Sequence, residues 1–165
     1  RSLRARGLED IDFSDPLTRL ITSLFLKDVA DFLFDAQRRE RMKARLRERL
    51  STGNGPFVLI AHSLGSVIAY SLLLELKGEF PLAQLVTIGS PLGLQEVQDQ
   101  LKTLTKQPRG LAVPACVKRW INVADPLDPV CADKQLAGDY APTNGVRVPS
   151  DRPPRKNKIA THGMP

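Results

Sequence analysis

The stretch that decides the fold is FVLIAHSLGSVIAY, residues 57–70. Four apolar residues lead into the segment AHSLG at residues 61–65, and the pattern then becomes that of a helix. A short, continuously apolar run is typical of a strand buried in a parallel sheet, so we expect a fully buried strand over residues 57–61. A helix should follow over residues 64–77. Ser63 then lies at a sharp turn, where it is either a nucleophile or only a helix cap.

Strand and helix patterns alternate through the rest of the chain. We expect a helix over residues 36–50, a second buried strand over 84–89, a helix over about 94–106 and a third strand over 117–123. A short fourth strand is expected at residues 145–148. Helical segments that separate strands predict the α/β class, with a mostly parallel sheet flanked by helices in three layers. Loops or linkers are expected at residues 52–56, 108–114 and 149–158.

Polar residues follow each predicted strand. The carboxyl ends of parallel strands meet at one edge of a sheet, which is where open α/β sheets bind their ligands. A serine, an acid and a histidine are therefore expected at the same edge, in the chain order of nucleophile-elbow enzymes. These residues are Ser63 after the first strand, Gly89, Ser90 and Pro91 after the second, Asp125 and Asp128 after the third, and His162 after the fourth.

Each member of this group has an expected role. A neutral hydroxyl is a weak nucleophile, so Ser63 needs a base, and we assign that role to His162. His62 adjoins the serine, and we expect its side chain to pack behind the turn. An acid orients the histidine and stabilises its imidazolium form. We prefer Asp128 for this role and keep Asp125 as the alternative.

The turn around the serine carries two further expectations. The residues two before and two after it must be small for the turn to close, and Ala61 and Gly65 meet that demand. The N–H of Leu64, at the start of a helix, can stabilise an oxyanion. Ser90 does not lie in such a turn. We therefore expect it to be a pocket wall, and the pocket to be lined by His62, Gly89, Ser90 and Pro91.

Taken together, four segments resemble the α/β-hydrolase superfamily, on the side of the bacterial lipases and esterases. They are FVLIAHSLGSVIAY, LVTIGSPLGL, RWINVADPLDPV and the loop that carries His162. The resemblance covers residues 36–165 and implies hydrolysis of small-molecule or lipid esters by a serine hydrolase with a catalytic triad. The reaction would pass through an acyl-enzyme on Ser63, without a cofactor or a metal.

The same resemblance raises an expectation about the N-terminal part. The family's early strands, which supply the second oxyanion donor, have no counterpart before Phe57, where the pattern looks helical. We therefore expect a fragment of the fold that lacks the N-terminal strands. Residues 1–165 should form a single domain, in which residues 1–35 are a helical flanking or lid-like segment beside a core at 36–165.

Length and composition limit the class of protein. A chain of 165 residues suits one domain, and 42% hydrophobic and 25% charged residues are ordinary for a globular protein. No apolar run approaches the roughly 18–20 residues needed to cross a membrane. Cys116 and Cys131 do not form a disulfide framework, and two histidines in total argue against a zinc site. We expect a cytoplasmic location.

The net charge of +6 is concentrated locally, since residues 37–49 hold seven of the 24 lysines and arginines. We interpret this helix as solvated on one face, with Met42, Leu46 and Leu50 as its core-facing stripe. Sparse aromatic residues argue against nucleic-acid binding. Two alternatives to the enzyme are kept. One is a catalytically inactive binding module with the same fold, and the other is peripheral contact with an anionic membrane through Arg38, Arg41, Arg45 and Arg49.

Overall fold

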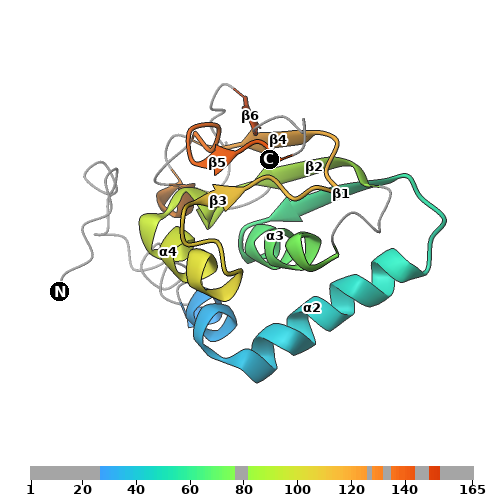
Figure 1. Ribbon diagram of the computed structural model, residues 1–165, viewed down its shortest axis with the longest axis horizontal. Helices are drawn as coiled ribbons and strands as arrows, with labels where there is room; N and C mark the ends of the chain where they lie inside the picture. The colour runs from blue at the N-terminus through green and yellow to red at the C-terminus, as the bar shows by residue number, and fades with distance from the viewer. Residues whose placement is uncertain (1–26, 77–81, 126–127, 132–134, 144–148, 153–165) are drawn as a thin grey trace.

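The fold is built on a small parallel sheet with helices beside it (Figure 1). The computed structural model describes residues 27–76, 82–125, 128–131, 135–143 and 149–152. In the main sheet the strands follow the order β1-β2-β4-β6, and every neighbouring pair is parallel. This confirms the α/β class with a mostly parallel sheet flanked by helices. The strands are β1 Phe57–His62, β2 Leu82–Ile88, β4 Trp120–Val123 and β6 Ser150–Asp151, and β3 Leu111–Ala112 pairs with β5 Tyr140–Ala141 in a second, two-stranded sheet.

The helices lie in two layers beside the sheet. Figure 1 shows α3 between the sheet and α2, and α3 contacts both β1 and α2. The Asp35 carboxylate caps α2 by accepting hydrogen bonds from the N–H groups of Gln37 and Arg38. The α-helices are residues 27–34, α2 Ala36–Ser51, α3 Leu64–Glu75 and α4 Gln95–Leu104, and the 3-10 helices are η1 Pro91–Gly93 and η2 Pro129–Cys131.

Most expected elements are present, and two expected loops need correction. The helices and the first three strands lie where the sequence predicted them, within a few residues. The predicted fourth strand at 145–148 lies outside the described residues. Instead, β6 at residues 150–151 falls in the expected loop 149–158, and β3 falls in the expected linker 108–114. Both are only two residues long, which is too short for a periodic sequence pattern.

The prediction that the first strand is fully buried was wrong. Ala61 is 5% exposed, but Val58 and Ile60 are each 60% exposed. Two features coincide here: β1 has β2 on one side only, and Val58 and Ile60 pair with Gln84 and Val86, which are also only half-buried, so this part of the sheet is incompletely covered. A continuous apolar run looks the same in the sequence whether its strand is central or at an edge.

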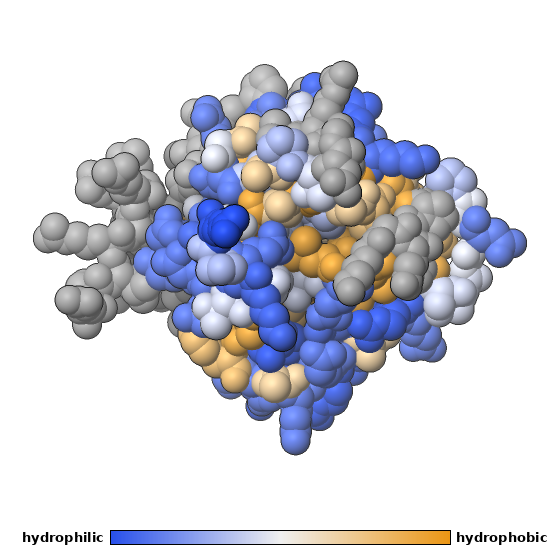
Figure 2. All heavy atoms as spheres, viewed as in Figure 1, coloured by the Kyte–Doolittle hydropathy of each residue, from blue (hydrophilic) through white to orange (hydrophobic). Residues whose placement is uncertain are grey.

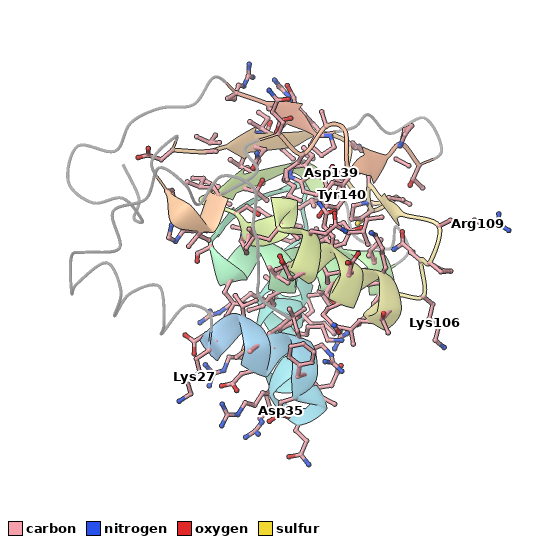
Figure 3. All side chains as sticks on the ribbon, turned by 90° about the vertical axis from the view of Figure 1, so that its left-hand side faces the viewer. Lys27, Asp35, Lys106, Arg109, Asp139 and Tyr140 are labelled. Atoms are coloured by element: carbon pink, nitrogen blue, oxygen red, sulfur yellow. The ribbon has the colours of Figure 1, made fainter. Side chains whose placement is uncertain are left out.

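The core lies on the α3 side of the sheet and centres on three aromatic rings. Tyr70 of α3 lies 5.8 Å from Trp120 of β4 and 5.2 Å from Tyr140 of β5, between ring centroids, and the last two are 5.0 Å apart. Tyr140 is 1% exposed, whereas Figure 3 shows Lys106 and Arg109 pointing away from the molecule. Burial raises the pKa of both tyrosines, so their hydroxyls stay neutral and donate to backbone carbonyls.

Charged side chains join α2 to α3. The Lys43 side chain is only 4% exposed, and its Nζ binds Glu75 of α3 and Glu40 at 2.7 Å. Arg47 reaches the other oxygen of Glu75 at 3.0 Å. Beside these contacts, Met42, Leu46 and Leu50 pack on the core as predicted.

The structure also bears on the cysteines and on membrane-spanning helices. Cys116 and Cys131 are both buried and are not joined by a disulfide. Among the described residues, no helix combines the length and apolar character required to cross a lipid bilayer.

Candidate functional site

Ser63 occupies the turn between β1 and α3 in a strained backbone conformation. Its φ of 53° and ψ of −130° lie in a region that residues with a side chain rarely adopt, at a cost of order 1–3 kcal/mol. Backbone hydrogen bonds of its N–H and its carbonyl hold Ser63 in this conformation. The Ser63 N–H donates to the Ile88 carbonyl of β2 at 2.9 Å, and its carbonyl accepts from the Ser66 N–H at 2.9 Å. The side chain makes no capping hydrogen bond to α3, so this serine is not simply a helix cap.

The start of α3 surrounds the serine with backbone donors. Leu64 is the first residue of the helix, so its N–H has no partner within the helix and the helix dipole points its positive end at the turn. This is the geometry expected of an oxyanion donor. The structure corrects one expectation: a Cβ added to Gly65 would meet no atom of the described residues within 4 Å. A small residue is therefore not sterically required there, because this position opens into a groove.

The close approach that requires glycine is at Gly89, directly after β2. Its φ is +55°, and a Cβ there would lie 3.2 Å from Nε2 of His62 and 3.3 Å from Oδ2 of Asp128. Its N–H donates to the Val123 carbonyl at 3.1 Å, which fixes the end of β2 beside the end of β4. The side chains of His62 and Asp128 thus converge on one point at the carboxyl edge of the sheet. The sequence had assigned Gly89 only to a pocket wall.

Asp128 is the buried acid at this edge. It is 4% exposed, and its Oδ1 accepts the Val130 N–H at 2.8 Å. The thiol of Cys131 donates to Oδ2 at 3.7 Å, and burial together with the Asp128 carboxylate raises the pKa of this thiol. Asp125 precedes it on the same loop and accepts the Asp128 N–H at 3.2 Å through its backbone carbonyl. Asp128 is therefore the acid next to His62, and the choice between Asp128 and Asp125 as the partner of His162 stays a prediction.

Ser90, the serine that follows β2, has a structural role. It is 3% exposed, and its Oγ lies 2.7 Å from Oγ of Ser66 in α3. The same oxygen accepts the Leu92 N–H at 3.3 Å and so caps η1. Ser90 therefore ties η1 to α3, and its neighbours Gly89 and Pro91 are also buried. Their predicted contact with a substrate stays a prediction.

A groove of about 460 Å³ runs beside the serine turn, between α2, β1 and α3. Figure 2 shows apolar colours over β1 and α3 on this face, bordered by hydrophilic α2. His62 and Gly65, on either side of the Ser63–Leu64 pair, both contribute to its lining. The remaining lining residues are Met42, Arg45, Leu46, Glu48, Arg49, Leu59, Ile60, Ala61, Ile68 and Ala69.

Two further expectations bear on the chemistry of the site. His162, the predicted base, lies outside the described residues. Within residues that the structure does describe, no three His, Cys, Asp or Glu side chains form a group able to hold a metal ion. The described part of the site is therefore a strained serine, a helix N-terminus and a buried acid beside a histidine.

Comparison with known proteins adds no relative. No protein-family model matches this sequence, and neither a curated protein nor a solved structure matches it significantly.

Proposed function

We propose that this protein is a serine hydrolase that cleaves carboxylic esters, lipid esters among them, through an acyl-enzyme on Ser63. The observation that carries the proposal is the backbone conformation of Ser63. A residue with a side chain persists in such a conformation only when its surroundings enforce it, and such strain is concentrated at functional sites. A serine held on a strained turn from strand to helix is the arrangement of a nucleophile elbow.

The surroundings of Ser63 support a defined mechanism. The Ser63 hydroxyl attacks the ester carbonyl while His162 takes its proton, and the Leu64 N–H stabilises the negative oxygen that forms. Asp128 orients the histidine. The alcohol leaves with the proton from His162, and water then releases the acid and restores the serine. His162 enters this scheme on sequence order alone.

The fold supports the same assignment at a coarser level. Strands β1, β2 and β4 follow one another in the main sheet and run in parallel, so Ser63, Gly89 and Asp128 follow strand ends at one edge. We propose on this ground that the chain has an α/β-hydrolase-like fold, with helices on both faces of the sheet and early strands that these residues do not include. Such strands would extend the sheet beyond β1.

The experiment that tests the function is labelling with a fluorophosphonate, followed by mass spectrometry to locate the adduct. We expect an adduct on Ser63 that disappears in Ser63→Ala. Ser51→Ala is the matched control, because Ser51 is exposed at the end of α2, and its labelling pattern should equal that of the wild type. Labelling that persists in Ser63→Ala would overturn the assignment. A folded protein without any adduct would instead favour the inactive binding module.

A further inference from the structure

A hydrogen-bond chain leads from η1 to the backbone of the serine turn. The Leu92 N–H donates to Oγ of Ser90 at 3.3 Å, and Oγ of Ser90 lies 2.7 Å from Oγ of Ser66. The Ser66 hydroxyl in turn donates to the carbonyl of Ser63 at 2.6 Å. Ser90 directly precedes η1 and Ser66 lies in the first turn of α3, so the hydrogen-bond chain joins two separate segments of the fold.

The number of hydrogens fixes the donor and the acceptor of each link. A serine hydroxyl carries a single hydrogen, and a carbonyl oxygen can only accept. Ser66 gives its hydrogen to a carbonyl, so Ser90 must be the donor in the contact between the two hydroxyls. The Leu92 N–H donates to the oxygen of Ser90. All three links therefore point toward the Ser63 carbonyl, and links that point the same way polarise one another.

Both hydroxyls of this hydrogen-bond chain are buried, Ser66 at 0% and Ser90 at 3% exposure. A helical serine often donates to a carbonyl three or four residues before it, so the link from Ser66 to Ser63 is ordinary by itself. The link from Ser90 is not local, and it holds the Ser66 hydroxyl in one orientation away from water. Because a buried polar group that loses its partner is costly, each of the two serines depends on the other.

The last acceptor belongs to the peptide group that carries the proposed oxyanion donor. The Ser63 carbonyl and the Leu64 N–H lie in one planar, trans peptide unit and point in opposite directions. The carbonyl accepts from the Ser66 N–H at 2.9 Å as well as from the Ser66 hydroxyl. Two donors on the carbonyl fix the plane of this peptide, and they thereby fix the direction of the Leu64 N–H.

We propose that Ser66 and Ser90 are positioning residues, which orient and polarise the Leu64 N–H through the Ser63 carbonyl. This inference rests on the hydrolase function proposed for Ser63. In this role neither serine needs to contact the substrate. An oxyanion donor acts on the charge that develops in the transition state, so loss of its alignment lowers kcat and leaves KM nearly unchanged.

The first test measures kcat and KM for p-nitrophenyl butyrate and the rate of fluorophosphonate labelling, on variants whose folding is checked by circular dichroism. Ser66→Ala should lower kcat and the labelling rate about five- to tenfold at unchanged KM. Ser66→Cys keeps a weaker donor of similar size, so its kcat should lie between those of Ser66→Ala and the wild type. Ser71→Ala is the matched control and should equal the wild type, since Ser71 is 3% exposed on the same helix but further from the turn.

The direction of the hydrogen-bond chain predicts unequal and dependent effects. Ser90→Ala removes an outer link, so it should lower kcat about two- to threefold, less than Ser66→Ala does. In the Ser66→Ala background, Ser90→Ala should have no further effect on kcat, because Ser90 acts through Ser66. Equal kcat in Ser66→Ala and Ser71→Ala would overturn the proposal, and so would effects that multiply in the double variant.

Amide exchange, measured by NMR, tests the hold on the turn without any chemistry. The Ser66 N–H donates to the Ser63 carbonyl, and its exchange should become about threefold faster in Ser90→Ala but not in Ser71→Ala. Unchanged exchange in Ser90→Ala would overturn the positioning role even if Ser63 takes the label. A folded wild type without an adduct would overturn the function and the positioning role with it, while faster exchange in Ser90→Ala would still show that the hydrogen-bond chain holds the turn.

Discussion

At the scale of single residues, the strained backbone of Ser63 can be tested by substitution. A glycine at this position adopts a φ of 53° without a steric penalty, whereas alanine keeps the strain of serine. We therefore expect Ser63→Gly to unfold in urea with a free energy about 1 kcal/mol higher than that of Ser63→Ala. Both variants should lose the fluorophosphonate adduct.

Lys106 provides the control for this prediction. Its φ is 55°, and its exposed side chain points away from the molecule (Figure 3). Lys106→Gly should gain about 0.5–1 kcal/mol from relief of strain alone, with labelling of Ser63 unchanged. If Ser63→Gly proved less stable than Ser63→Ala while Lys106→Gly gained stability, strain at the serine turn would be refuted.

Substitution of alanine for each of two glycines near the serine should change the unfolding free energy in different directions. Gly89→Ala forces a Cβ against His62 and Asp128 at a positive φ, so we expect a loss of about 2–4 kcal/mol in unfolding free energy. Gly65→Ala adds a methyl group where the described residues leave room, and alanine favours the helix, so stability should not fall. Urea unfolding followed by circular dichroism measures both. A greater loss for Gly65→Ala would mean that the serine turn, not the end of β2, is the tight point.

The two glycines also show what the sequence could predict about the site. Ser63 was identifiable because its signal is local: an apolar run, a serine and the start of a helical pattern within a few residues. The steric demand at Gly89 comes from His62 on another strand and from Asp128 on a third segment. Such a contact depends on how distant segments pack, and the only local signal was a glycine directly after a strand.

At the scale of elements, the buried end of Lys43 makes the α2–α3 contact sensitive to its partner. Glu75→Gln removes the acid shared by Lys43 and Arg47 and leaves a poorly compensated ammonium group, so we expect a loss of about 1–3 kcal/mol. Lys43→Met removes the buried charge itself and keeps the packing of the long side chain. Its unfolding free energy should stay within about 1 kcal/mol of the wild type.

Glu40 supplies the control for this contact. It binds Lys43 at 2.7 Å but is 59% exposed, so Glu40→Gln should change stability by less than Glu75→Gln. Chemical denaturation of the three variants under one condition gives the comparison. A larger loss in Lys43→Met than in Glu75→Gln would contradict this account, because it would make the lysine itself the stabilising element.

Element types were predictable, whereas the surroundings of each element were not. Helix α2 followed from its apolar stripe at Met42, Leu46 and Leu50, and the structure packs that stripe on the core. The apolar run of β1 indicated a strand but not an edge position, because edge and centre differ in their neighbours and not in their own residues. The exposure of Val58 and Ile60 depends on neighbouring segments in the same way.

At the scale of the whole molecule, the order of the strands brings the loops of the candidate site to one edge of the sheet. Parallel neighbours along the chain bring successive loops to one edge, so the expectation that a serine and an acid lie near each other needed only the alternation of elements. The strand at the β6 end of the sheet was not predicted. Strand β6 is two residues long, Ser150–Asp151, and neither residue is apolar, so no hydrophobic pattern marks it.

Asp151 therefore gives the prediction for the whole fold. Its carboxylate accepts hydrogen bonds from the Asn122 side chain at 3.0 Å, from the Leu136 N–H at 2.9 Å and from the Ala137 N–H at 3.0 Å. Asp151→Ala should lower the unfolding free energy by about 2–3 kcal/mol. It should also change the fluorescence of Trp120, the single tryptophan, which reaches Asn122 through Thr87. Ser150→Ala, at the exposed neighbouring residue, should stay within about 0.5 kcal/mol of the wild type. Equal stability of the two variants would mean that β6 is not fastened by this carboxylate.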